Sequence, residues 1–462
     1  MSIALFGLIA AVALLIWLAM RGIDIVFAAL LCALLVIVTN GLPLDQGLIK
    51  NFALGPLGAF TFAGKFFLLF VTGAMFGRVM GDSHAAASIA LALVRRLGAH
   101  RALWITTLAC ALLTYGGVVV FVVIFAMYPL GLRLLQEADI PKRLFCAALA
   151  LGAGTFTLTA MPGTPSIQNV ISSVGLGTDL FAGFWLGIGG GVLMFAGGIW
   201  YLEWQRRLAA ERGEGFEPGP RDQLAPMSDD SYPNWILASL PMAIVLLTII
   251  VPRVIVLAAG EQVLAGSSTL AQLLTFANAQ PVLWPSIALT AGSVTALLLF
   301  SGLRRHGLRT LGAGTQDAIM PLISTAAVIG FGGVITQTEG FQSIAQTLTQ
   351  SELPPLISMF TAVSVISAVT GSASGGLQIF MQTLAPTYIE QGMDPETLHR
   401  LATMASGGFD SLPHCGAVVA MLTITQLTHR QAYRDVGVIT VVIPVLATLT
   451  MLGAAAMTGA AG

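Results

Sequence analysis

A helix-length apolar stretch interrupted by prolines and polar residues constrains this fold more than any other feature. Residues 155–169 read Thr-Phe-Thr-Leu-Thr-Ala-Met-Pro-Gly-Thr-Pro-Ser-Ile-Gln-Asn, with two prolines and five hydroxyl side chains. Because lipid cannot replace a lost backbone hydrogen bond, a broken helix at membrane depth persists only where protein or water satisfies the freed groups. A second interruption, at residues 407–416, contains Asp410, Pro413 and His414. Paired interruptions of this kind indicate the binding site of a membrane transporter.

The composition supports a membrane protein. Of 462 residues, 56% are hydrophobic and 9% are charged, whereas soluble domains average about 25% charged. A net charge of -1 offers no field for nucleic acid, and the four cysteines lack the spacing of a metal site or a disulfide framework. Residues 3–20 lack a basic flank and a cleavage site, so we expect them to be a retained first span.

Apolar runs long enough to cross about 30 Å of hydrocarbon identify the plain spans. They lie near residues 3–20, 24–40, 58–79, 180–200, 234–258, 282–301, 318–337 and 435–457. Two more apolar stretches, about 102–135 and 355–390, are interrupted by Gly- and Ser-rich segments at 114–117 and 370–376. Each is either a plain span or a re-entrant helical hairpin. Two broken helices are expected at about 144–174 and 398–427.

Basic residues predict the orientation. With the N-terminus outside and both hairpins re-entrant, 17 of the 21 Lys and Arg residues are cytoplasmic, leaving Lys50, Lys65, Arg253 and Arg400 outside. The two halves then have inverted topology. The predicted fold is an all-α polytopic membrane protein of two inverted repeats, each with a re-entrant hairpin and a broken helix. Its parts are residues 1–200, a cytoplasmic linker at 201–233, and residues 234–462.

Three elements carry a family resemblance: the break from Pro162 to Pro165, the hairpin tip at 371–376, and the break at 406–416 with its Asp and His. On these the chain resembles the gluconate:proton symporter (gluconate permease) family of the ion transporter superfamily, over roughly residues 60–200 and 315–435. It departs at the first break, where Met-Pro-Gly-Thr-Pro-Ser stands in place of a Pro-Pro-His-Pro-Gly-Pro type sequence.

The resemblance implies proton-coupled import of a small organic anion by alternating access. The anion would be gluconate-like or a short-chain hydroxy monocarboxylate. It also implies a scaffold-plus-transport arrangement, a homodimer and a bacterial inner-membrane location. The expected partners are therefore the carboxylate substrate, the lipid bilayer and a second copy of the chain. A sodium-coupled carboxylate transporter of the same superfamily is the alternative.

The negative charge of a bound anion needs compensation. No Arg or Lys falls well inside a predicted crossing, except Lys65 near the outer end of the span at 58–79. Half-helix N-termini at the breaks and tips are expected to supply it, since free N–H groups and the helix dipole favour anions. The alternative for any single hydroxyl is helix packing. The predicted substrate-binding residues are Thr159, Gly163, Thr164, Ser166, Asn169, Gly116, Gly117, Ser372, Ser374 and Gly375.

Asp410 is the one carboxylate deep inside a predicted crossing, and His414 follows it by four residues. Intramembrane acids are costly and indicate function, so the pair is predicted to couple transport to protons. A structural ion pair or helix cap is the alternative. His399 is expected to be solvated beside a charged loop. No enzyme motif is present, and no cofactor or metal is expected beyond the coupling ion. The repeat favours alternating access over a channel.

Overall fold

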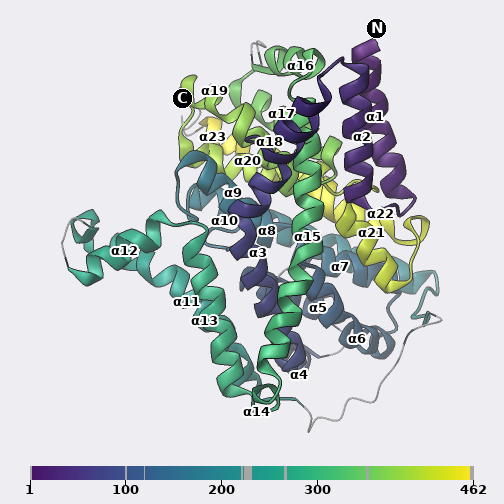
Figure 1. The fold of residues 1–462 in the computed structure, drawn as a ribbon. Coiled ribbons are helices and arrows are strands. Elements are labelled where there is room, and N and C mark those ends of the chain that lie inside the picture. Colours follow the sequence, from purple (N-terminus) through teal and green to yellow (C-terminus); the bar gives the residue numbers. More distant parts are fainter. Residues whose placement is uncertain are drawn as a thin grey trace.

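The computed structural model describes residues 3–98, 101–118, 120–219, 222, 232–264, 268–349 and 353–457. These residues form helices, turns and loops, without a strand, which confirms the predicted all-α class (Figure 1). Side-chain caps begin several helices, as at Asp24, Asn234, Ser268 and Asp394. Each cap accepts a hydrogen bond from a first-turn amide that has no partner inside the helix.

Five helical segments are long and apolar enough to cross a membrane. The first joins the π-helix η1 (Gln46–Leu54) to α3 (Ala59–Asp82), and the last joins α22 (His429–Gly437), η5 (Val438–Val442) and α23 (Ile443–Met457). The other three are α10 (Phe184–Glu211), α11 (Trp235–Ala259) and α15 (Gly307–Ile335). The helix pair α12 (Thr269–Ala279) and α13 (Leu283–Leu299) adds a sixth candidate, bent by 104°. These segments coincide with predicted spans. Because α10 continues to Glu211, the first part of the predicted linker is helical.

One group of helices is built around α3 and α15, which pack against each other along their length (Figure 1). Gly314 permits the approach, because a Cβ there would lie 2.6 Å from the Cα of Met75. Small residues at such contacts are typical of helices packed in membranes. The helix pair α1 (Ile3–Met20) and α2 (Ile25–Thr39) joins α15, while α13 joins α3.

The second group contains the predicted hairpins and broken helices. Hairpin one is α5 (Ala102–Tyr115) and α6 (Val120–Ala138), and hairpin two is α17 (Pro355–Thr370) and α18 (Ala373–Thr383), followed by α19 (Ala385–Glu390). The first broken helix is α7 (Lys142–Gly154), the single turn α8 (Phe156–Thr159) and α9 (Ile167–Leu176). The second is α20 (Pro395–Phe409) and α21 (Gly416–Thr425). Both hairpin tips turn on a glycine with positive φ: 94° at Gly117 and 59° at Gly371.

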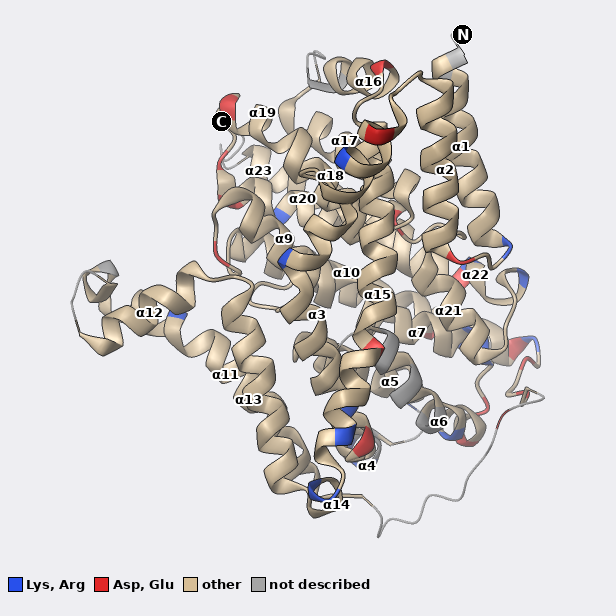
Figure 2. Cartoon of the chain, in the orientation of Figure 1, with Lys and Arg blue, Asp and Glu red and all other residues tan. Residues whose placement is uncertain are grey.

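Elements of the two sequence halves interleave. Helix α9 packs against α18 and α20, α6 packs against α21, and α10 packs against α23. The short helices α4 (Ala85–Leu97) and α14 (Ser301–Arg304) lie at one end of the molecule and α16 (Glu339–Thr349) at the other (Figure 1). Lys and Arg gather near α4, α6, α14 and the loops beside α22, while the opposite end carries few (Figure 2). The 3-10 turn η4 (Glu261–Leu264) follows α11.

Candidate functional site

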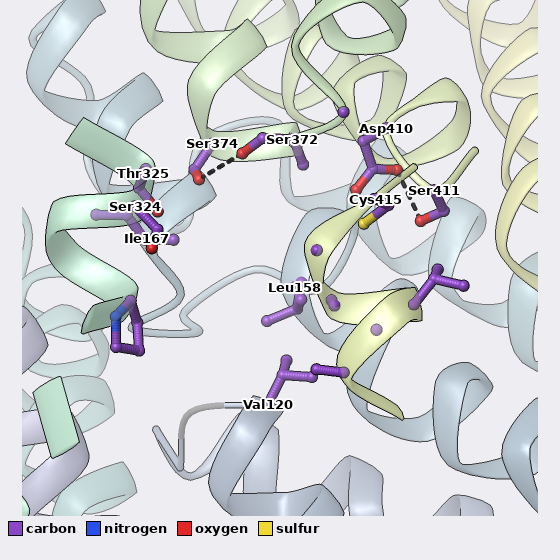
Figure 3. Close-up of a pocket in the computed structure, with 18 of the residues that line it drawn as sticks. Val120, Leu158, Ile167, Ser324, Thr325, Ser372, Ser374, Asp410, Ser411 and Cys415 are labelled. Carbon is purple, nitrogen blue, oxygen red and sulfur yellow. Dashed lines mark hydrogen bonds between the residues drawn. The ribbon is translucent and has the colours of Figure 1, made fainter. Parts of the chain in front are cut away.

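A cavity of about 620 Å³ lies where both hairpin tips and both helix breaks meet. Its wall is completed by α3, α13 and α15, which contribute among others Gly73, Leu289 and Pro321. Figure 3 shows hydroxyl-bearing side chains on facing walls of this cavity, with Asp410 and Ser411 beside them. The predicted breaks and tips therefore come together around a single space.

Break one presents the start of α9 to the cavity. Ser166 is the N-cap: its Oγ accepts from the Asn169 amide at 3.3 Å and donates to the Leu158 carbonyl at 2.7 Å. Ser166, Ile167 and Gln168 line the cavity. The restarting half-helix thus opens its N-terminus toward the space where an anion would sit.

Other predicted residues of break one lie behind the cavity wall. Asn169 is fully buried and donates to the carbonyls of Thr164 and Leu180, while its Oδ1 lies 2.8 Å from His399 Nε2. Thr159 bonds the Thr155 carbonyl and packs against Gly407 of α20. Because α20 covers this side of the break, these side chains hold helices together and do not reach the cavity.

Gly163 and Thr164 also lie outside the cavity lining. The amide of Gly163 donates to the Leu180 carbonyl at 2.8 Å, and its φ of 76° fits the turn. Thr164 is fully buried, and its hydroxyl has no hydrogen-bond partner among the described residues. At the tip of hairpin one, Gly117 lines the cavity, whereas Gly116 backs onto Met242 of α11.

The tip of hairpin two brings Ser372 and Ser374 into the cavity. Ser372 caps α18 by accepting from the Gly375 amide at 3.1 Å, and its Oγ lies 3.3 Å from that of Ser374. Gly375 lies behind them, where an added Cβ would contact Val328 of α15 at 3.3 Å. Of these three predicted residues, the two serines line the cavity and the glycine brings α18 close to α15.

Break two places Asp410 and His414 on the cavity wall. The Asp410 carboxylate accepts from the Ser411 hydroxyl at 3.0 Å and lies beside the N-terminus of α18, whose first residue is Ala373. The His414 Nε2 lies 3.0 Å from the Ala368 carbonyl. The two side chains share the cavity but form no ion pair with each other among the described residues.

Sequence reasoning missed Ser324 and Thr325, which reach the cavity from α15 (Figure 3). They lie in an unremarkable apolar span, and Pro321 is its only local signal. The side chain of Gln168 and the Cys415 thiol are further lining groups that were not predicted.

The expectation that His399 is solvated was wrong: His399 is fully buried in α20, as is its neighbour Arg400. The Arg400 guanidinium donates to the carbonyls of Ala182, Ala160 and Leu180 at 3.0, 3.1 and 3.2 Å. His399 joins Asn169 and Thr178. Their sequence neighbours, Pro395, Glu396 and the Asp394 cap, resemble a loop flank, but they begin a helix that the first broken helix covers.

A polar cluster away from the cavity ties the linker to both broken helices. Asp222 accepts from Lys142 of α7 at 2.8 Å, from Tyr128 of α6 at 2.7 Å and from Gln426 after α21 at 2.9 Å. Burial alone would raise the pKa of Asp222, but hydrogen bonds from Lys142, the Gly219 amide and Tyr128 outweigh it and leave that pKa lowered. We call Asp222 and these three side chains the linker cluster.

No three His, Cys, Asp or Glu side chains come together as a metal site in the part of the chain that the structure describes. Among the many apolar lining residues, the polar groups are hydroxyls, helix N-termini, the Gln168 amide, the Cys415 thiol, one carboxylate and one imidazole. Such a set can hold an anion and exchange a proton.

Comparison with known proteins assigns nearly the whole chain to one family. The family described as GntP family permease matches residues 3–457. An uncharacterized transporter of Bacillus subtilis (strain 168), YxjC, is 35% identical over 458 residues, covering 94% of each chain. Among solved structures, the Alcanivorax borkumensis YdaH transporter, described as having an unusual topology, aligns with a TM-score of 0.49 and 15% identity. That alignment covers 86% of this chain and 88% of the other.

Proposed function

This chain belongs to the GntP permease family, a family of membrane transporters, and from that premise we propose that it imports a small organic anion by proton symport. The observation that carries the proposal is the contact between Asp410 and the N-terminus of α18 inside the shared cavity. The anion would be gluconate-like or a short-chain hydroxy monocarboxylate.

Three half-helices support anion binding in this cavity. The first residues of α9, α18 and α21 all line it, so unpaired first-turn amides and the positive ends of three helix dipoles converge there. No Lys or Arg is among the lining residues. In this proposal the remaining first-turn amides of the half-helices that Ser166 and Ser372 cap take the place of a basic side chain.

The position of Asp410 suggests how a proton and an anion are coupled. When ionised, its carboxylate would compete with a substrate carboxylate for the amide donor of Ala373 at the N-terminus of α18. Protonation removes that negative charge and frees the donor, so the proton and the anion bind together. His414, whose ring lies against the Gly371 tip, is proposed to pass the proton to or from the cavity.

Alternating access would follow from two inverted repeats. In such a repeat, the contact of α9 with α18 in one half corresponds to the contact of α21 with α6 in the other. Helices α3 and α15 correspond to each other and would form the centre of the proposed scaffold. Helix α11 leaves most of its apolar surface uncovered within one chain, which lipid or a second copy would cover. The family resemblance implies a bacterial inner membrane and a homodimer, and both are part of the proposal.

Uptake into proteoliposomes tests the coupling. We expect an inwardly directed proton gradient to drive accumulation of a carboxylate, gluconate or 3-hydroxybutyrate being the first probes, without a requirement for sodium. Asp410→Asn should abolish accumulation yet keep exchange of internal for external substrate, because exchange needs no net change of protonation. Uptake that depends on a sodium gradient and survives Asp410→Asn would overturn the proposal.

A further inference from the structure

Two adjacent hydroxyls on α15 face the cavity without a protein partner. Ser324 and Thr325 line the cavity and are half-buried, and neither hydroxyl forms a hydrogen bond with any described residue. Helical Ser and Thr side chains commonly bond the carbonyl one turn earlier. Elsewhere on the same helix, Thr315 does so to Leu311 at 3.0 Å and Thr336 to Gly333 at 2.9 Å. The pair at 324 and 325 is therefore turned toward the cavity and away from its own backbone.

The neighbours of Ser324 and Thr325 place this pair close to the N-terminus of α18. Pro321, one turn earlier, lines the same wall. One turn later, Val328 lies 3.3 Å from the position of a Cβ on Gly375 of α18. Figure 3 accordingly shows Ser324 and Thr325 near Ser372 and Ser374, with Asp410 farther along the cavity. A ligand whose carboxylate sits at the α18 N-terminus would extend toward α15.

Gln168, which also lines the cavity, carries a buried polar atom that lacks a partner. Gln168 is 7% exposed, and its Oε1 forms no hydrogen bond among the described residues. A buried polar atom without a partner costs roughly 1–3 kcal/mol, so such groups are normally satisfied by a ligand or water. A ligand with a bare alkyl chain would displace water from these polar side chains without replacing the hydrogen bonds that water makes. A hydroxyl on the ligand can replace them, because it both donates and accepts.

We propose that Ser324 and Thr325 are specificity-determining residues, which select a carboxylate carrying a hydroxyl over the same acid without one. This inference rests on the proposed function, because it assumes that the cavity holds a carboxylate. It assigns recognition of the hydroxyl to α15, and recognition of the charge to the half-helices.

Binding of matched acids to the purified full-length protein tests the inference. The probes are gluconate with hexanoate, 3-hydroxybutyrate with butyrate, and lactate with propionate; the members of each pair have equal charge and carbon number. Dissociation constants come from thermal-shift titrations, since a ligand that binds only the folded state raises the melting temperature. The variants are Ser324→Ala, Thr325→Val and the double variant. Thr315→Val is the control, because its hydroxyl bonds its own helix.

We expect the wild type to prefer the hydroxy acid of at least one pair by about tenfold, and each single variant to reduce that preference about fivefold. Affinity for the unsubstituted acid should stay unchanged, and Thr315→Val should keep the wild-type preference. An unchanged preference in the double variant, or an equal loss of both acids, would overturn the inference while leaving the proposed function intact. Equal affinity of the wild type for the hydroxy acid and the unsubstituted acid in every pair would also overturn the inference and leave the proposed function intact. If no acid binds the wild type at all, the proposed function itself fails.

Discussion

Arg400 shows how one side chain can hold two broken helices together. It lies in α20 and is fully buried, yet every bond that its guanidinium makes is to a backbone carbonyl of the first broken helix or the loop after α9. The break after α8 frees the Ala160 carbonyl from regular helix bonding, and the carbonyls of Leu180 and Ala182 lie in the loop between α9 and α10. The planar fork of arginine reaches several of them at once, which the single ammonium of lysine cannot do.

We therefore expect both Arg400→Met and Arg400→Lys to lower stability, by about 3 kcal/mol for the methionine because the carbonyls lose their donors in a buried site. Lysine should rescue only part of the loss. Thermal unfolding in detergent measures the effect, with Arg305→Lys, at the exposed C-cap that follows α14, as the control. A lysine variant as stable as the wild type would show that charge alone matters at this position.

Among elements, the tip of hairpin two depends on a glycine that no other residue can replace without strain. Gly371 has a φ of 59°, and an added Cβ would lie 2.6 Å from Cδ2 of His414. The left-handed conformation costs an L-residue roughly 1–2 kcal/mol, and the contact with the imidazole adds to it. The turn and the second break are thus fitted to each other.

Gly371→Ala should lower the melting temperature through both effects, and adding His414→Ala should recover the part due to the clash. The double-mutant cycle isolates this interaction, because the φ cost remains in both backgrounds. Thermal unfolding of the two single variants and the double variant gives the coupling. Additive losses would mean that the imidazole moves aside freely.

The linker cluster makes a pH-dependent contribution to the stability of the fold. The Asp222 side chain is fully buried against Lys142, and removing one partner of a buried pair costs about 3–5 kcal/mol. The pKa of Asp222 is lowered in the folded protein. The carboxylate therefore stabilises the fold above its unfolded pKa of about 3.9, and this contribution is lost as pH falls through the lower folded value.

Asp222→Asn should consequently be less stable than the wild type by a constant amount from pH 7 to about pH 4, with the difference shrinking at lower pH. Melting temperatures over that range measure it, and Glu137→Gln, at an exposed carboxylate of α6, should show no such difference. A gap that stays constant down to pH 3 would argue that Asp222 does not titrate in this way.

The sequence predicts the helix breaks and hairpin tips better than it predicts the directions in which their side chains point. Proline and glycine mark both breaks and both tips, because backbone chemistry acts locally. Asn169 and Thr159 sit in the predicted break but face α20, since which side of a broken helix is open depends on its neighbours. Ser324 and Thr325 went unnoticed because a plain apolar span gives no sign of which face meets a cavity.

At the scale of the whole molecule, helix length bears on how the hairpins meet the membrane. Helix α5 has 14 residues and α17 has 16, which correspond to about 21 and 24 Å. Neither alone crosses about 30 Å of hydrocarbon, whereas α3 and α15, with 24 and 29 residues, are long enough. These short first arms favour hairpins that enter and leave on one side with tips near the middle, while α6, the second arm of hairpin one, has 19 residues and reaches about 28 Å.

If the two halves are inverted, the bases of the hairpins lie on opposite sides of the membrane. Gln136, near the end of α6, and Glu390, at the end of α19, are both exposed positions at those bases. In a Cys415→Ser background, where the three remaining cysteines are buried away from the cavity, single cysteines at these positions can be labelled separately. A membrane-impermeant maleimide should modify position 390 from outside in intact cells, and position 136 only after the cytoplasmic face is opened.

The basic residues that gather near α6 support this assignment of sides, because cytoplasmic loops carry the excess of Lys and Arg. Labelling of both positions from the same side would rule out inverted hairpins, and with them an alternating-access cycle built on two matching halves.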